Sequence, residues 1–110
     1  MNTAEQLKGA VLEQLGTGKA TAITGSELAY RLDKSNTRTI RLAIRELIAD
    51  GIPVIGSMHR PYGYFIAENI EECLGYMAQL RGYLIEEAKR RRDIKRLAER
   101  YFSGQLLMFR

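Results

Sequence analysis

The spacing of apolar residues along the chain predicts four helices and one small hairpin. Apolar side chains recur every three or four residues, the period of a helix with one buried face, in four segments: 3–15, 24–32, 35–50 and 70–102. Two short runs, 52–56 and 64–66, are rich in β-favouring residues and are bounded by Gly or Pro, as strands are. Residues 20–23 are expected to form a further short edge strand. The expected fold is therefore mainly α with a small β-hairpin and a long C-terminal helix.

Polar residues mark the expected starts of three helices. Thr24 and Glu27 have the spacing of a capping box, in which each side chain accepts from a free backbone N–H of the first turn. Asn69 and Glu72 repeat this spacing before the last helix. Ser35 is expected to cap the third helix with its hydroxyl group. Two short helices joined by so brief a connection are typical of a helix-turn-helix.

The expected third helix carries arginines opposite its apolar face. Its apolar residues are Ile40, Ala43, Ile44, Leu47 and Ile48. Arg38, Arg41 and Arg45 fall together on the other side, where three guanidinium groups repel one another unless an anion lies between them. DNA phosphates and guanine edges both accept bidentately from arginine. A merely solvated basic face is the alternative, and the helix alone does not decide between the two.

The connection 57–63 between the expected strands is polar and carries His59 and Arg60 at its tip. His59 is the only histidine and has no cluster of carboxylates nearby, so a metal site or a catalytic histidine is not expected. Contact with a phosphate is the simpler role for both residues. A hairpin with this tip, directly after a basic helix, has the character of a wing.

Four segments in the same order make residues 4–67 similar to a winged helix-turn-helix domain of the biotin-repressor type. They are Thr24–Ala29, Ser35–Arg41, Leu47–Val54 and Gly63–Ile66. The resemblance implies that the third helix enters the major groove of DNA and that the hairpin touches an adjacent groove or the backbone. The biotin repressor also carries a ligase domain, for which this chain is too short. It has no glycine-rich phosphate loop and no catalytic constellation.

The resemblance also assigns roles to single residues. Base contacts are expected from Asn36, Thr37 and Arg41. Phosphate contacts are expected from Arg38, Arg45, His59 and Arg60, and from the free backbone amides at the start of the second helix. The expected partner is double-stranded DNA, and no cofactor is expected.

Composition favours an acidic partner and the cytosol. The formal net charge is +4, which favours nucleic acid over a neutral partner. Cys73 is the only cysteine and has apolar neighbours, so neither an internal disulfide nor a reactive thiol is expected, and its side chain should face a core. No apolar run reaches the roughly 20 residues that span a bilayer, and the start of the chain lacks the layout of a signal peptide.

The long helix expected over 70–102 follows a first domain of residues 1–69 and precedes an extended tail, 103–110. Its first part, 70–88, has an apolar side and a row of small residues, which together predict a homodimer. The candidate dimer residues are Leu74, Gly75, Met77, Ala78, Gly82 and Leu84. Tolerated glycines are the alternative for the small residues. The basic run 89–96 is either a solvated face or a second contact with nucleic acid.

The tail contains Gln105-Leu106-Leu107-Met108-Phe109, which resembles the Gln-Leu-Ser/Asp-Leu-Phe pentapeptide by which bacterial replication proteins bind the sliding clamp. Gln105, Leu106 and Phe109 match the motif, and Met108 replaces a leucine of similar volume. Leu107 departs from the small or acidic residue at the third position. Packing of these apolar side chains against a dimer partner is the alternative.

These patterns together predict a small cytosolic protein that binds duplex DNA. It is similar to phage or prophage transcription regulators and replication accessory proteins, and the sequence does not separate the two. The alternative is a protein–protein module on a winged-helix scaffold that docks on a partner such as the sliding clamp. An enzyme is not expected, since the chain has one Cys, one His and no motif that positions a pair of acids.

Overall fold

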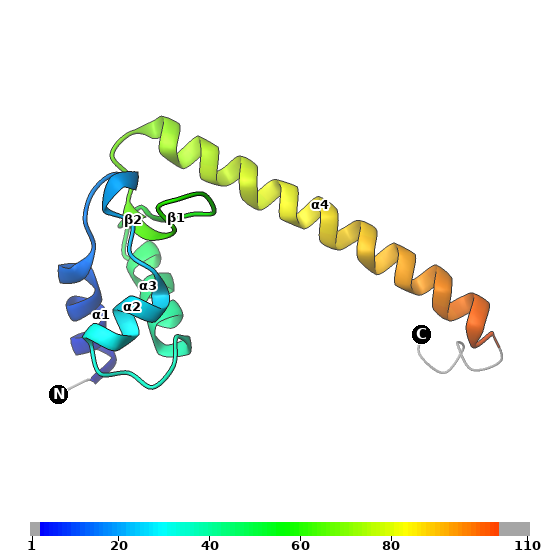
Figure 1. Cartoon of the computed structure of the whole chain (residues 1–110), viewed down its shortest axis with the longest axis horizontal. Coiled ribbons are helices and arrows are strands. Elements are labelled where there is room, and N and C mark those ends of the chain that lie inside the picture. The colour runs from blue at the N-terminus through cyan, green and yellow to red at the C-terminus, as the bar shows by residue number, and fades with distance from the viewer. Residues whose placement is uncertain (1–2, 104–110) are drawn as a thin grey trace. The chain divides into compact units, whose positions relative to one another are not determined.

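The computed structural model describes residues 3–103 and is mainly helical, with one two-stranded antiparallel sheet and a long last helix (Figure 1). In chain order the elements are α1 (Thr3–Gln14), the 3-10 helix η1 (Lys19–Thr21), α2 (Gly25–Arg31), α3 (Arg38–Ala49), β1 (Val54–Ser57), β2 (Gly63–Ile66) and α4 (Ile70–Tyr101). The coarse fold expected from the sequence is confirmed. Contacts divide the chain into two compact units, Met1–Tyr76 and Met77–Arg110.

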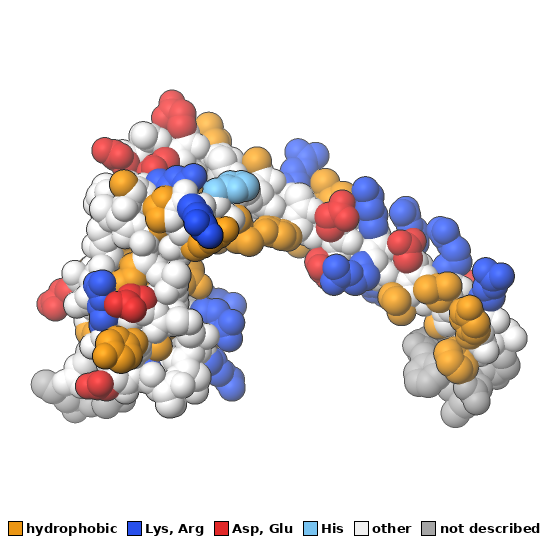
Figure 2. Space-filling model, in the orientation of Figure 1, with side chains coloured by type: hydrophobic (Ala, Val, Ile, Leu, Met, Phe, Trp, Pro, Cys, Tyr) orange, Lys and Arg blue, Asp and Glu red, His pale blue; other side chains and the backbone are white. Residues whose placement is uncertain are grey.

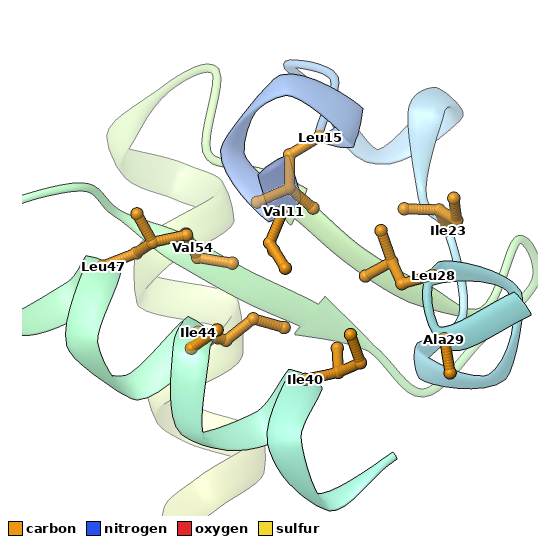
Figure 3. Packing of buried hydrophobic residues seen from close by; sticks show 10 residues of the cluster. Val11, Leu15, Ile23, Leu28, Ala29, Ile40, Ile44, Leu47 and Val54 are labelled. Carbon is orange, nitrogen blue, oxygen red and sulfur yellow. The ribbon is translucent and has the colours of Figure 1, made fainter. Parts of the chain in front are cut away.

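The core of the first unit forms where α1, α2 and α3 converge with β1 (Figure 3). Val11, Leu28 and Ile40, one from each helix, are fully buried. Four of the five apolar residues expected on the inner face of α3 are buried, but Ile48 is 50% exposed. The expectation for Ile48 is wrong because 100° per residue carries it past the edge of the buried face.

The sheet pairs β1 with β2 in the register Val54↔Ile66 to Ser57↔Gly63. The second edge of β2 is met by two isolated bridges, of Thr17 with Ile66 and of Ile23 with Tyr64. The Ile23 N–H donates to the Tyr64 carbonyl at 3.0 Å, and the Ile23 carbonyl accepts from the Tyr64 N–H at 2.7 Å. The strand expected over 20–23 is therefore wrong. Residues 19–21 form η1 instead, because the Thr21 N–H and hydroxyl both donate to the Gly18 carbonyl and close a tight turn.

The N-terminus of α3 differs from the sequence prediction. Ser35 does not cap the helix, which begins three residues later, at Arg38. The Asn36 side-chain oxygen instead accepts from the Arg38 N–H at 3.0 Å, an Asx-type turn that satisfies one free amide. The prediction was wrong because residues 35–37 form a bend, so the N-cap position falls to Thr37, whose side chain makes no cap hydrogen bond.

In both expected capping boxes, the side chain of the cap residue makes its expected hydrogen bond. Thr24 Oγ1 accepts from the Glu27 N–H at 3.1 Å, and Asn69 Oδ1 accepts from the Glu72 N–H at 2.9 Å. The Glu27 carboxylate turns to Arg31 rather than back to the cap.

The Glu72 carboxylate has two partners outside its own helix. Its Oε1 accepts from the Glu68 N–H at 2.7 Å, and its Oε2 accepts from the Lys19 N–H at 3.1 Å. This bridge ties the start of α4 to η1.

Cys73, expected to face a core, is half-buried. Burial, together with the nearby Tyr64, raises the pKa of the Tyr76 hydroxyl above its ordinary value.

We expect Gly63→Ala to destabilise the first unit strongly. Gly63 has φ +124, and a Cβ there would lie 2.2 Å from the backbone carbon of Ile23. Both strain and overlap oppose any side chain, so the free energy of unfolding should fall by about 3 kcal/mol, as measured by urea denaturation.

Gly51 is the matched control for Gly63. It also has a positive φ, +98, but a Cβ there would meet nothing within 4 Å. Gly51→Ala should therefore cost only about 1 kcal/mol, from backbone strain alone. Equal losses for the two variants would contradict the close packing of β2 on Ile23.

Candidate nucleic-acid interface

Three arginines line the exposed side of α3. Arg38, Arg41 and Arg45 are spaced by three and four residues, so they share one stripe, and all three side chains are exposed. Figure 2 shows blue Lys and Arg side chains gathered along this helix. We call this set the arginine row.

The arginine row has no acidic partner among residues 3–103. The ion pairs in that part of the chain involve Lys8, Arg31, Lys89 and Arg90. Arg31 shows the contrast, since its Nε lies 3.1 Å from a Glu27 carboxylate oxygen and its Nη1 donates to Gln14 at 3.2 Å. The three guanidinium groups of the row are thus available to an external anion.

The acidic residues of this region lie on the opposite flank of α3. Asp50, just after the helix, lies 2.6 Å from Lys8 Nζ of α1. The carboxylates of Asp50 and Glu5 raise the pKa of the Lys8 ammonium group. Glu46 lines a shallow depression beside α1, together with Leu7 and Leu42. Because contact with α1 draws the acids to one flank, the arginine row keeps an unopposed positive charge.

The two polar residues before α3 differ in availability. Asn36 is exposed, and its NH2 group has no hydrogen-bond partner in the described part of the chain. Thr37 is half-buried, and its methyl group would lie 3.7 Å from a Cβ on Gly25 of α2. Of these two residues, Asn36 is therefore the more accessible to a base.

The loop between β1 and β2 carries the remaining predicted contacts. Residues 58–62 are all exposed, including His59 and Arg60. Ser57 Oγ donates to the His59 carbonyl at 2.6 Å and accepts from the His59 N–H at 3.3 Å, which fixes the base of the loop. In Figure 1 the hairpin extends to the side of the first unit on which α3 lies, away from α1. The structure thus brings a basic loop and the arginine row to one side.

Exposed apolar residues accompany these cations, and the sequence interpretation missed them. Ile48 lies three residues after Arg45 on the same side of α3, and it is half-exposed. Met58 and Tyr62, at the loop, are 50% and 52% exposed. Apolar side chains of this kind can contact thymine methyl groups in the major groove. The position of Ile48 at the edge of the apolar stripe was the signal that could have identified it.

The candidate dimer residues on α4 are exposed and fall on two faces. Leu74, Met77 and Leu84 lie on one side of the helix. Gly75 and Gly82 lie nearly opposite Met77 and Leu84, since each residue turns the helix by 100°. Ala78 lies between, about 40° from Leu74. A Cβ on Gly75 or Gly82 would meet nothing within 4 Å. One partner helix centred on Met77 and Leu84 therefore leaves Gly75 and Gly82 uncovered.

Two other kinds of site have no counterpart in residues 3–103. No group of three or more His, Cys, Asp or Glu is placed to hold a metal ion there. None of the described helices combines the length and apolar character needed to cross a membrane.

The clamp-like residues Gln105, Leu106, Met108 and Phe109 lie outside the described residues. No family model, curated protein or solved structure matches the chain.

Proposed function

We propose that the chain is a small cytosolic protein that binds duplex DNA with α3 and the β1–β2 hairpin, in the manner of a winged helix-turn-helix domain. The observation that supports this most strongly is the arginine row, which is exposed and lacks an acidic partner among the described residues. In a winged helix that served only as a protein scaffold, acidic neighbours would be expected to neutralise such a row. Here the acids lie on the α1 flank instead.

In this proposal α3 lies in the major groove, which is wide enough to admit one helix. Arg41, in the middle of the exposed stripe, donates bidentately to a guanine edge, and Asn36 offers its NH2 group to a base at the helix start. Arg38 and Arg45 hold phosphates on the two sides of the groove. His59 and Arg60 contact the backbone from the loop.

We further propose that two copies pair through α4, so that the protein reads two half-sites. No side chain of α4 is buried within one chain, and its large apolar residues, such as Met77 and Leu84, are exposed. A water-exposed helix of 32 residues with so much apolar surface is better accounted for by a partner.

This function has two forms, a replication accessory protein and a phage or prophage transcription regulator. Gln105-Leu106-Leu107-Met108-Phe109 is similar to a clamp-binding pentapeptide, which would link DNA bound by α3 to the replication machinery. If the tail binds a clamp and the arginine row binds no DNA, the protein is an interaction module on a winged-helix scaffold instead.

Recovery of bound fragments from a random duplex pool tests the DNA-binding proposal directly. The unmodified full chain should enrich a defined sequence, with two copies of a motif if it binds as a dimer. Affinity for the enriched duplex should fall steeply with salt, because each neutralised phosphate releases counterions. Failure to retain any duplex at 50 mM salt and micromolar protein would refute the proposal.

Arg60→Ala should weaken binding to all duplexes alike. A loop arginine that contacts the DNA backbone contributes charge but no sequence preference. The slope of log affinity against log salt concentration should therefore become less steep by about one for each chain. Arg31→Ala is the matched control, because this arginine is already paired with Glu27 on another face. Loss of sequence preference in Arg60→Ala would show instead that the loop reads bases.

A further inference from the structure

The second unit carries a seven-residue repeat along α4. Counting from Met77, apolar residues occupy six of the eight first and fourth positions of successive heptads, and we call these eight positions the α4 seam. Its members, in order, are Met77, Leu80, Leu84, Glu87, Arg91, Ile94, Ala98 and Tyr101. The large apolar members are 44–72% exposed, and Figure 2 shows apolar side chains open along this helix. The repeat covers about three and a half heptads, enough for a two-helix coiled coil.

Only Glu87 and Arg91, at the centre of the seam, are charged. In a parallel pair in register each seam residue faces its own copy, so Glu87 would face Glu87 and Arg91 would face Arg91 in adjacent layers. Both layers would bring like charges together where water is excluded, which is strongly unfavourable. Charge thus opposes the parallel arrangement.

An antiparallel pair removes this conflict. First-position residues then face fourth-position residues of the other copy, and a two-fold axis beside residue 89 sets Glu87 against Arg91 in both central layers. The same register sets Leu84 against Ile94, Leu80 against Ala98 and Met77 against Tyr101. Every apolar member of the seam therefore meets an apolar partner, and each charged one meets its opposite.

The residues that flank the seam fit the same register in part, because Arg81 would face Lys95 of the other copy, a pair of like charges. Tyr83 faces Leu97 of the other copy, and Ala88 faces its own copy beside the axis, where a small side chain permits close approach. Arg90 also meets its own copy there. Its Nη1 lies 3.3 Å from a Glu87 carboxylate oxygen of the same helix, which offsets the repulsion.

We propose that α4 pairs with a second copy of itself in antiparallel orientation, with the two-fold axis beside residue 89 and Glu87 paired with Arg91 across it. This deepens the dimer of the proposed function, because it fixes the seam, the orientation and the register. It places the seam on the apolar side, so the small residues Gly75, Ala78 and Gly82 face away from the partner helix.

Charge exchange in the full chain tests the contact between Glu87 and Arg91. Glu87→Lys and Arg91→Glu should each weaken self-association at least tenfold in sedimentation equilibrium, because each sets like charges together twice by symmetry. An equimolar mixture of the two variants should associate again. Pairs within one helix cannot produce this rescue, since each variant chain keeps like charges at 87 and 91. Failure of the mixture to associate would overturn the register.

Glu86→Lys is the matched control for Glu87→Lys. It makes the same change one residue earlier, on the outer side of α4, so self-association should change less than threefold. Gly82→Glu, on the small-residue side, should also leave the pair intact. Dissociation by Gly82→Glu would place the interface on the opposite face and overturn the proposal.

Distances between spin labels test the orientation. A single label at position 99, in a chain with Cys73→Ser, should give a distance of about 30 Å or more, because residue 99 lies ten residues from the axis on each copy. A parallel pair would keep the labels within the width of two helices, about 20 Å, and would overturn the orientation while leaving a dimer. A monomer at 100 µM protein would overturn the dimer as well, without bearing on DNA binding by α3.

Discussion

Reversal of the arginine row, by Arg38→Glu, Arg41→Glu and Arg45→Glu together, is expected to abolish measurable DNA binding. Each substitution removes a contact and adds a negative charge next to the phosphates. The single change Arg41→Ala should already cost about 1–3 kcal/mol on the preferred site if Arg41 pairs with a guanine. Fluorescence anisotropy with the selected duplex and with a scrambled duplex measures both effects.

The single changes also separate the roles within the row. Arg41→Ala should reduce the preference for the selected duplex over the scrambled one, because a base contact carries sequence information. Arg38→Ala and Arg45→Ala should lower both affinities by a similar factor, because phosphate contacts do not. None of the three should change thermal stability much, since all three side chains are exposed and have no partner in residues 3–103.

The matched control for the triple reversal is Lys89→Glu, Arg92→Glu and Arg96→Glu on α4. It changes the net charge by the same amount, and all three residues lie outside the α4 seam. If α3 is the reading element, this variant should retain sequence preference and lose only part of its affinity. Equal loss in both variants would show that binding follows net charge, and unchanged affinity in the α3 variant would refute the interface.

Local sequence patterns were sufficient to predict most of the elements. The periodicity of α3 predicted five buried positions, and four of them are buried. The prediction works because apolar residues on the one packed face of a helix recur every three or four residues. Its start was missed because the bend at 35–37 moves the N-cap to Thr37, whose side chain makes no cap hydrogen bond and so leaves no capping signal in the sequence. The short strand at 20–23 was wrong because Gly18 and Thr21 form a tight turn that the strand pattern did not reveal.

The content of the candidate site was predictable, but its electrostatic isolation was not. The spacing of Arg38, Arg41 and Arg45 places them on one stripe whatever the tertiary fold. Whether acids lie among them depends on contacts between segments far apart in the sequence. Lys8 and Asp50 are 42 residues apart, and only the packing of α1 against α3 brings their charged groups to 2.6 Å.

The same reasoning applies to α4, where the sequence pattern identified candidate dimer residues but did not separate the sides of the helix on which they lie. Leu74, Met77 and Leu84 were grouped with Gly75, Ala78 and Gly82 because both sets recur at helical spacing. The continuous helix Ile70–Tyr101 places Gly75 and Gly82 nearly half a turn from Met77 and Leu84, with Leu74 and Ala78 between them. The sedimentation of Glu87→Lys and Gly82→Glu therefore decides between two faces that the sequence alone did not distinguish.

A peptide of residues 101–110 is expected to bind a purified bacterial sliding clamp, and the double change Gln105→Ala and Phe109→Ala should weaken that binding at least 30-fold. Peptides bound in grooves depend on a few anchoring side chains, and these two are the ends of the motif. In the full chain the same double change should abolish capture of the clamp on a surface while leaving DNA binding by α3 unchanged.

Leu107 supplies the matched control, because it is the position at which the tail departs from the motif. Leu107→Asp restores an acidic third residue and should preserve or strengthen clamp binding. If the tail instead packs its apolar side chains against a dimer partner, Leu107→Asp should weaken self-association and leave the clamp unbound. Absence of clamp binding by the unmodified full chain at tens of micromolar would remove the link to replication and leave a transcription regulator as the form of the DNA-binding protein.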